Sequence, residues 1–572
     1  MRPLWFGPED RPLFGWLHLP EGGEARGAVL LCPTMGIEAV NARYAYMYLA
    51  DRLADAGLAC LRFDYDGTGD SAGQQNDPNR VQAWLNSIQR AMEVLRGLGT
   101  DRIGVVGLRM GATLLAESFG SGPAVVEDLV LWDPCASGRS FLREQSALWA
   151  FALGREPAGD GSVETPGLVY DKDTVAAMSP LAIANGDGPL AGRVLVLTRA
   201  GRNGDRRANE RLALPHTERT SIVGQEELVD VLPDAAKIPE ATITTIVEWL
   251  ASGAESGHAV AIDADAVGRT VAVVGKTPDG ARIEERAVSL GPFGLFGVVT
   301  SRVRPESTVG ESGADDLPTI LFLNAGVIDH VGPAGLWVRL GRRWAEAGFR
   351  AVRLDLSGNG DSPAHPGPSG RVVFSSHHEQ DIVDVLRALS PRDPSNAVLV
   401  GLCSGGFNSI EPAIEIKVRG VCALNPILTF KVPDGENGGE PDQGPAQRKG
   451  GMKGWVGKMP GYSLMNRISK RLPSSAWWII NRIAVDITPA KRLARMVDAG
   501  VDVLVIAGTD EGRWLRGGET RTLHRLEQTG RFRMLVIPGL EHTLFEHSTR
   551  EVAVRILSDH VVGRFGAPTA PR

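Results

Sequence analysis

The sequence contains few cysteines and no long apolar run, and these absences exclude several classes of protein. The five cysteines are widely spread, without the Cys-x-x-Cys or Cys-x-x-His spacing of a zinc site and without the density of a disulfide framework. No stretch of about 18 apolar residues, the length that suggests a membrane span, is present. Residues 1–20 include acidic residues and prolines where a secretory signal needs an apolar run. We expect a cytoplasmic protein with no membrane span, no metal and no other cofactor.

The charge balance gives no reason to expect nucleic acid as a partner. The net charge is −7, and the 23% of charged and 43% of hydrophobic residues are ordinary for a soluble globular protein. A chain of 572 residues is long enough for two or more domains with separate cores. The oligomeric state is left open.

The chain repeats one pattern twice. LRFDYDGTGDS at residues 61–71 corresponds to VRLDLSGNGDS at 352–362, and each is followed by a glycine-framed turn, GLRMG at 107–111 and GLCSG at 401–405. Apolar runs alternate with stretches of helical periodicity in both halves. This alternation predicts two α/β domains, each with a mostly parallel sheet and helices on both faces.

The domain boundary is predicted in a small, polar segment near residues 251–258. We therefore expect domains at 1–252 and 258–572. Each half interrupts its strand–helix order after the glycine-framed turn and the strand that follows it. These interruptions predict helical cap inserts at about 136–190 and about 427–500.

The second insert contains a basic segment without Asp or Glu, residues 443–485, in which tryptophans are interleaved. One interpretation is a solvated lid surface, because charge runs are often only that. Another is a docking face for an anionic group such as coenzyme A, a phosphopantetheine arm or an acidic acyl carrier protein. A membrane-surface role is a third. The candidate docking residues are Arg448, Lys449, Lys453 and Lys458, and Trp455 is a candidate for the substrate pocket.

Cys403 is the candidate nucleophile. It lies at the centre of GLCSG, after a β-branched strand and before a segment that can begin a helix. The small residues two positions before and after it are typical of a tight turn that holds a nucleophile in a strained conformation. Ser404 is the competing nucleophile, although its own frame would place Leu402 at a small position. A buried, inert cysteine is the remaining alternative.

His542 and Asp510 are the candidate base and acid. Each follows an apolar strand, and the chain order of nucleophile, acid and histidine fits this kind of site. Asp510 would orient the imidazole, and His542 would accept and return the proton. Taken singly, Asp510 is also compatible with a helix cap and His542 with a loop residue. Glu511 and Glu541 are substitutes for the acid, and His547 is a poorer substitute for the base.

The oxyanion hole is predicted from backbone N–H groups of Ser404 and Gly326. Asn324 and His330 lie beside the second of these turns, where they either line the substrate pocket or hold the turn. Asp355 and Asp361 recur in the first half as Asp64 and Asp70, so we interpret them as scaffold residues.

The first half lacks the reactive groups. Arg109 stands where the second half has its cysteine, and a guanidinium has no lone pair with which to attack a carbonyl. The strand that matches the histidine strand is followed by residues 225–227, Gln-Glu-Glu. Arg109 therefore has either a structural or interface role or an anion-binding role at the start of a helix.

At these residues the chain resembles the α/β-hydrolase superfamily, as two tandem copies over nearly its whole length, which implies an α/β-hydrolase fold with a helical cap insert in each copy. FDYDGTGDS, GLRMGATL and LWDPCASGRSFLRE are similar to bacterial hydrolases associated with exosortase A systems and related biosynthetic clusters. The Cys-His-Asp set is similar to that of dienelactone hydrolases and polyhydroxyalkanoate synthases, which implies an acyl-thioester intermediate. Cys403 replaces the usual serine, so the substrate class stays open between esters, lactones and thioesters.

Three hypotheses about function follow. The first is an acyl hydrolase of the esterase or thioesterase type, in which Cys403 attacks the carbonyl carbon. The second is an acyltransferase that passes the same acyl group to an amine or alcohol, which a dry pocket would favour. The third is a pseudoenzyme that binds an acyl carrier or another partner. The acyl group and its acceptor are left open.

Overall fold

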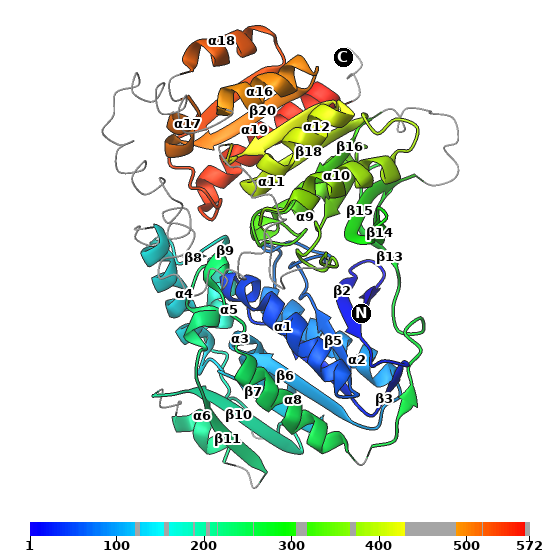
Figure 1. Cartoon of the computed structure of the whole chain (residues 1–572). Coiled ribbons are helices and arrows are strands. Elements are labelled where there is room, and N and C mark those ends of the chain that lie inside the picture. Colours follow the sequence, from blue (N-terminus) through cyan, green and yellow to red (C-terminus); the bar gives the residue numbers. More distant parts are fainter. Residues whose placement is uncertain are drawn as a thin grey trace, which may run out of the picture. The chain divides into compact units, whose positions relative to one another are not determined.

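The computed structural model describes residues 1–120, 126–153, 159–186, 189–201, 206–213, 216–255, 257–304, 317–365, 373–428, 488–516 and 519–566. The chain forms two compact units, Met1–Val274 and Gly275–Arg572 (Figure 1). The division comes later than the predicted segment at 251–258. Strand β12 (Val260–Ala261) pairs with β3 (Glu24–Ala25), and Arg269 forms a bridge to Trp5, so the residues after 252 pack on the first unit.

The first unit is built on an eight-stranded sheet, ordered β1-β2-β5-β4-β6-β7-β10-β11. The first two strands pair antiparallel and the others are parallel. The strands are β1 (Arg2–Phe6), β2 (Leu13–His18), β4 (Ala28–Cys32), β5 (Ala59–Phe63), β6 (Ile103–Leu108), β7 (Asp128–Trp132), β10 (Arg193–Arg199) and β11 (Thr217–Ile222). Strands β4 to β7 are buried along their whole length, as expected for parallel strands covered on both faces.

Helices cover both faces of this sheet (Figure 1). One face packs on α1 (Ile37–Asp55) and α8 (Glu240–Ala254), the other on α2 (Arg80–Gly97) and α3 (Met110–Phe119). The insert after β7 contains α4 (Gly138–Leu153), β8 (Val163–Thr165), β9 (Leu168–Tyr170) and α5 (Lys172–Met178). The remaining elements are α6 (Arg206–Arg211), α7 (Glu226–Val229) and the 3-10 helix η1 (Pro233–Ala235).

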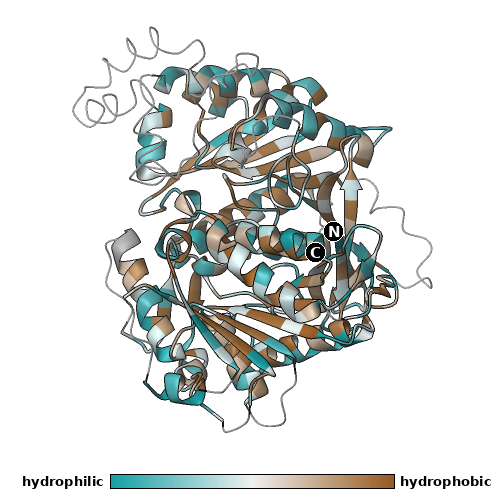
Figure 2. Ribbon diagram, turned by 60° about the horizontal axis from the view of Figure 1, so that its bottom comes forward, coloured by the Kyte–Doolittle hydropathy of each residue, from teal (hydrophilic) through white to brown (hydrophobic). Residues whose placement is uncertain are grey.

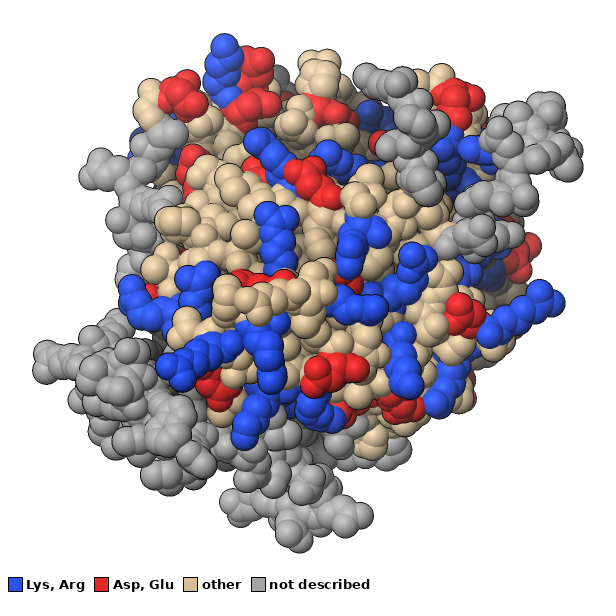
Figure 3. Space-filling view, turned by 90° about the horizontal axis from the view of Figure 1, so that it is seen from above, with Lys and Arg blue, Asp and Glu red and all other residues tan. Residues whose placement is uncertain are grey.

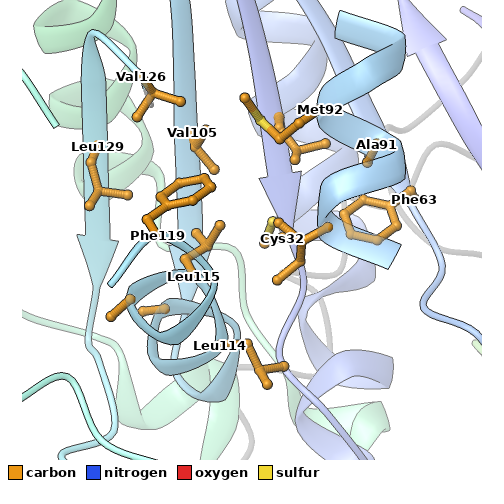
Figure 4. Close-up of a cluster of buried hydrophobic side chains, with 14 of the residues drawn as sticks. Cys32, Phe63, Ala91, Met92, Val105, Leu114, Leu115, Phe119, Val126 and Leu129 are labelled. Atoms are coloured by element: carbon orange, nitrogen blue, oxygen red, sulfur yellow. The ribbon is translucent and has the colours of Figure 1, made fainter. Parts of the chain in front are cut away.

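The core of the first unit shows what an inert cysteine looks like in this protein. Cys32 lies among apolar side chains that include Phe63 and Met92 (Figure 4), and its side chain is fully buried. Burial raises the pKa of the Cys32 thiol far above its usual range, although a hydrogen bond to Tyr65 acts in the opposite direction. A thiol in such surroundings is a poor nucleophile, because the thiolate is the reactive form.

The second unit is built on a nine-stranded sheet, ordered β13-β14-β15-β17-β16-β18-β19-β20-β21. Strands β14, β15 and β17 pair antiparallel, and the strands from β17 to β21 are parallel. The strands are β13 (Val271–Lys276), β14 (Arg282–Leu290), β15 (Leu295–Val303), β16 (Thr319–Phe322), β17 (Arg350–Leu354), β18 (Ala397–Leu402), β19 (Gly420–Leu424), β20 (Asp502–Gly508) and β21 (Phe532–Ile537).

Helices again form a layer on each face. One layer contains α9 (Leu336–Glu346), which follows the 3-10 helix η3 (Pro333–Gly335), and α19 (His547–Phe565). The other contains α10 (Ser376–Leu389), α12 (Ile410–Ile416), α16 (Pro489–Asp498), α17 (Thr509–Arg516) and α18 (Thr520–Gln528). The short helix α11 (Ser404–Asn408) directly follows β18. Most of the cap predicted at 427–500 lies outside the described residues. The predicted fold, two mostly parallel sheets flanked by helices, is confirmed.

Hydropathy follows this layering. Figure 2 shows the strands of both sheets mostly in hydrophobic colours, whereas the helices carry hydrophilic residues as well. Figure 3 shows Lys and Arg side chains spread over one face, with Asp and Glu side chains between them. None of the helices in the described ranges is long and apolar enough to cross a membrane.

The repeated Gly-Asp-Ser segments form the same hydrogen-bonded turn in both units. The Asp355 side chain accepts from the backbone N–H of Asp361 at 3.0 Å, and that of Asp64 accepts from Asp70 at the same distance. In each turn the following serine hydroxyl donates to the backbone carbonyl of the first aspartate. The interpretation of these aspartates as scaffold residues agrees with this geometry.

Candidate active site

Cys403 occupies a strained turn between a buried strand and a helix. It follows β18 and precedes α11, with φ 55° and ψ −111°. A residue with a side chain seldom adopts a positive φ, and such strain is concentrated at functional positions. Arg109 has nearly the same conformation in the first unit, with φ 53° and ψ −117°. The two glycine-framed sequences therefore form the same elbow.

The glycines around Cys403 show which residue this elbow presents. A Cβ atom on Gly401 would lie 2.3 Å from the carbonyl carbon of Gly405, and one on Gly405 would lie 2.6 Å from the carbonyl oxygen of Asn324. Both positions exclude any side chain, because real Cβ atoms do not approach other atoms so closely. The frame is centred on Cys403, as predicted, and not on Ser404.

His542 meets both a thiol and a carboxylate. Its Nδ1 lies 3.2 Å from Oε1 of Glu511. Burial lowers the pKa of His542, but the Cys403 thiol and the Glu511 carboxylate raise it, and it reaches about 10. Nε2 is buried, and within the described residues it has no hydrogen-bond partner. Catalytic hydrogen bonds often tighten only when substrate binds.

The prediction that Asp510 orients the histidine is wrong. Its side chain is 83% exposed, and its nearest charged partner is Arg513 at 3.5 Å. Helix α17 begins at Thr509, and successive helical residues are rotated by about 100°. Asp510 therefore points to solvent, whereas Glu511 points back towards the histidine. The carboxylate that contacts His542 is that of Glu511, which had been considered as a substitute.

The environment of Glu511 suits this role. Burial raises the pKa of Glu511, but the hydrogen bond to His542, a backbone hydrogen bond and the charge of His542 together outweigh it, so the pKa lies below its usual value. The carboxylate therefore stays charged and can fix the imidazole tautomer. Its side chain is about as shielded as that of His542, with 24% and 23% exposed, so water does not screen the pair fully.

The two other substitutes serve the local turn. Glu541 accepts hydrogen bonds from the backbone N–H of Thr543 and Glu546, at 2.7 and 3.2 Å. His547 begins α19 and has its Nδ1 3.1 Å from Arg550. Glu541 thus shapes the loop that carries His542.

The two predicted oxyanion-hole residues lie together. The backbone N–H of Gly326 donates to Oγ of Ser404 at 2.9 Å. Ser404 is 1% exposed, and a Cβ on Gly326 would meet nothing within 4 Å. The Gly326 N–H, which was predicted to donate directly to an oxyanion, therefore donates to the Ser404 hydroxyl instead.

Asn324 and His330 hold the turn that carries Gly326 and do not offer free polar groups to a pocket. Both donate to Asp355, Asn324 from Nδ2 at 2.8 Å and His330 from its backbone N–H at 2.7 Å, with Nδ1 of His330 also 2.8 Å from the carboxylate. Asn324 Oδ1 accepts from the N–H of Leu356 at 2.7 Å. Their side chains are almost fully buried.

The same cluster has the composition of a cation site. Ligand atoms of His330, Asp355 and Asp361 lie within 4.8 Å of one another. Each oxygen of Asp355 already has two hydrogen-bond partners, however, so a bound ion would have to displace them. The geometry is that of a hydrogen-bonded scaffold turn. The predicted pocket residue Trp455 and the predicted docking residues Arg448, Lys449, Lys453 and Lys458 lie outside the described residues.

Asn425 is a positioning residue that the sequence analysis missed. It follows β19 with φ 39° and is fully buried. Its Oδ1 accepts from the N–H of Gly508 at 2.8 Å, and its Nδ2 lies 3.1 and 3.2 Å from the carbonyl oxygens of Glu541 and His542. Asn425 therefore connects the end of the acid strand to the histidine loop. An asparagine directly after a buried strand was the available signal.

We expect Asn425→Asp to lower kcat/KM about 10- to 100-fold, because it removes the two donors that hold the histidine loop but keeps the acceptor for Gly508. Aspartate tolerates the positive φ. The lost hydrogen bonds should also lower the free energy of unfolding by about 1–3 kcal/mol. Steady-state kinetics and urea unfolding measure both effects.

Asn396→Asp is the matched control, because Asn396 directly precedes β18, at the opposite end of that strand from Cys403. Equal losses of kcat/KM in the two variants would contradict the positioning role of Asn425.

In the first unit the elbow holds a buried ion-pair network. Arg109 is 1% exposed and pairs with Glu38 at 3.2 Å, with Asp133 at 3.5 Å and with Glu144. The guanidinium is thus already matched by carboxylates, which favours the structural role over anion binding. Glu227, in the helix α7 that follows the strand matching the histidine strand, pairs with Lys237 at 2.9 Å.

Part of the second unit is similar in sequence to a known family. Residues 320–555 match the Alpha/beta hydrolase family, and no curated protein matches the chain. Dienelactone hydrolase from Anabaena variabilis is 12% identical, with 50% of this chain and 99% of that chain covered and a TM-score of 0.28. Carboxyl esterase 2 from Tuber melanosporum is 16% identical (50% and 89% covered, TM-score 0.30). Epoxide hydrolase from Vigna radiata is 17% identical (49% and 97% covered, TM-score 0.27). Cys403, Glu511 and His542 all lie within the segment that matches the Alpha/beta hydrolase family.

Proposed function

We propose that the second unit is an acyl hydrolase that acts on esters or thioesters through a covalent intermediate on Cys403. One observation carries the proposal: the thiol at the strained elbow interacts with His542, and Glu511 holds the other side of the same ring. A nucleophile, a base and an orienting acid in this relation are the minimal set for acyl transfer.

In the first step the proton of the Cys403 thiol is held by His542, whose pKa of about 10 favours the imidazolium at neutral pH, and Sγ attacks the carbonyl carbon. The electron pair of the C=O bond moves to oxygen, and the N–H of Ser404 stabilises the resulting oxyanion. When the intermediate collapses, the bond to the leaving group breaks and His542 returns the proton to it. The acyl group is then held on Cys403 as a thioester.

The second half of the reaction uses water as the acceptor. His542 takes a proton from water, the hydroxide oxygen attacks the thioester carbonyl, and the C–S bond breaks. The proton returns to sulfur, so the enzyme is regenerated and a carboxylic acid is released. We propose coenzyme A or an acyl carrier protein as the source of the acyl group. The resemblance to exosortase A system-associated hydrolases is also kept as part of this proposal.

Intact-protein mass spectrometry with a panel of activated acyl donors tests the proposal. We expect short or long acyl thioesters or nitrophenyl esters to add the mass of one acyl group, and prior alkylation of the thiol to prevent it. Product analysis with and without an amine or alcohol then separates hydrolysis from transfer. If no donor gives an adduct or a product, the protein is not an acyl hydrolase and a binding role takes its place.

A further inference from the structure

The side chain of Ser404 contacts the other predicted oxyanion donor, although only the backbone N–H of Ser404 was predicted to act. Its hydroxyl accepts a hydrogen bond from the N–H of Gly326 at 2.9 Å. Two N–H groups, those of Ser404 and Gly326, were predicted to bind the oxyanion together. One of them now points at a hydroxyl oxygen.

We propose that the Ser404 hydroxyl is itself the second donor of the oxyanion hole, with the Gly326 N–H behind it. This inference rests on the proposed acyl-transfer function of Cys403. A hydroxyl has one donor and two acceptor positions. Ser404 Oγ uses one acceptor position for Gly326, and within the described residues its proton has no acceptor. That proton is therefore free to donate to a developing negative charge.

The arrangement strengthens the donor. An N–H that donates to a hydroxyl oxygen polarises its O–H bond, and such chains of hydrogen bonds reinforce one another. Ser404 is 1% exposed, so water does not compete for the hydroxyl. Its backbone N–H lies at the start of α11, next to the nucleophile. One residue, directly after the nucleophile, thus supplies two donors.

Removal of this donor should slow the chemical step of the reaction. A transition-state donor contributes when charge develops on the carbonyl oxygen, and not when the neutral substrate binds. The expected signature is therefore a fall in kcat with little change in KM. A purely structural hydroxyl would instead alter stability or the reactivity of the nucleophile.

The degenerate first unit provides an independent comparison. Met110 follows Arg109 at its elbow, at the place of Ser404. The pairing registers of β4 with β6 and of β16 with β18 place Met35 where the second unit has Gly326. The first unit therefore lacks the hydroxyl, the glycine position and the nucleophile together.

Ser404→Ala and Ser404→Thr, made in the full-length protein, test the inference with the acyl donor that gives the highest wild-type rate. We expect kcat of Ser404→Ala to fall about 100-fold with KM almost unchanged. Ser404→Thr keeps a hydroxyl and should retain most of the activity. The rate of Cys403 alkylation by iodoacetamide should be the same in all three proteins, which shows that nucleophile and base are intact.

Wild-type kcat in Ser404→Ala would overturn the inference, because it would mean that the freed Gly326 N–H binds the oxyanion directly. A slower alkylation of Ser404→Ala would overturn it as well, since the hydroxyl would then act on the nucleophile. Failure of the proposed function looks different, because the wild-type protein itself would form no acyl adduct.

Discussion

Replacing Cys403 by alanine should eliminate the acyl adduct and lower kcat by at least about 10³-fold. The reason is that no other described group stands at the elbow with His542 beside it. Cys403→Ser should also be strongly impaired, because a hydroxyl loses its proton far less readily than a thiol. Steady-state kinetics and intact-protein mass spectrometry measure the two effects.

Cys422→Ala provides the matched control. Cys422 lies on the neighbouring strand β19, is fully buried, and burial raises the pKa of its thiol well above the usual range. Its removal should leave kcat unchanged. An adduct that persists in Cys403→Ala, or one that disappears in Cys422→Ala, would contradict the assignment of the nucleophile.

The second large effect is expected for Glu511→Gln, which should lower kcat by roughly 10²- to 10⁴-fold. The amide is nearly the same size, but it has no charge to stabilise the imidazolium and can hold the ring in the wrong tautomer. The pKa of His542 should also fall from about 10, because one of the two groups that raise it is gone. Above the new pKa the ring is neutral, so the change appears as an earlier loss of the imidazolium as pH rises.

Asp510→Asn is the control that the chain itself supplies. The two acids are adjacent in sequence, yet only one bonds the histidine, and the other is 83% exposed. We expect Asp510→Asn to keep the wild-type kcat and the wild-type pH profile. A larger loss of kcat in Asp510→Asn than in Glu511→Gln would restore the original prediction.

The elbow was predictable from sequence because its constraint is local. The glycines at 401 and 405 are required by backbone contacts within one turn, and such contacts leave a short pattern in the sequence. The order of nucleophile, acid and histidine could be recognised as well, because each follows an apolar strand. The alternation of strands and helices in the sequence was sufficient to predict the fold of both units.

The acid was misplaced by one residue for a physical reason. The choice between Asp510 and Glu511 depends on where α17 begins, since one residue of helix turns a side chain by about 100°. The sequence Gly-Thr-Asp-Glu allows a helix start at several positions. Asn425 was missed because its partners, Gly508 and the Glu541–His542 peptides, are distant in sequence. The role of Asn324 and His330 likewise depends on a distant residue, Asp355.

The ion pairs at Arg109 make it costly to place a nucleophile at the first elbow. A single change of Arg109 to cysteine would restore a thiol but leave Glu38 and Asp133, both nearly fully buried, without one of their cationic partners. Breaking a buried pair in this way costs about 3–5 kcal/mol. A nucleophile at this position would thus come with a destabilised first unit, which gives an energetic reason for the two elbows to hold different residues.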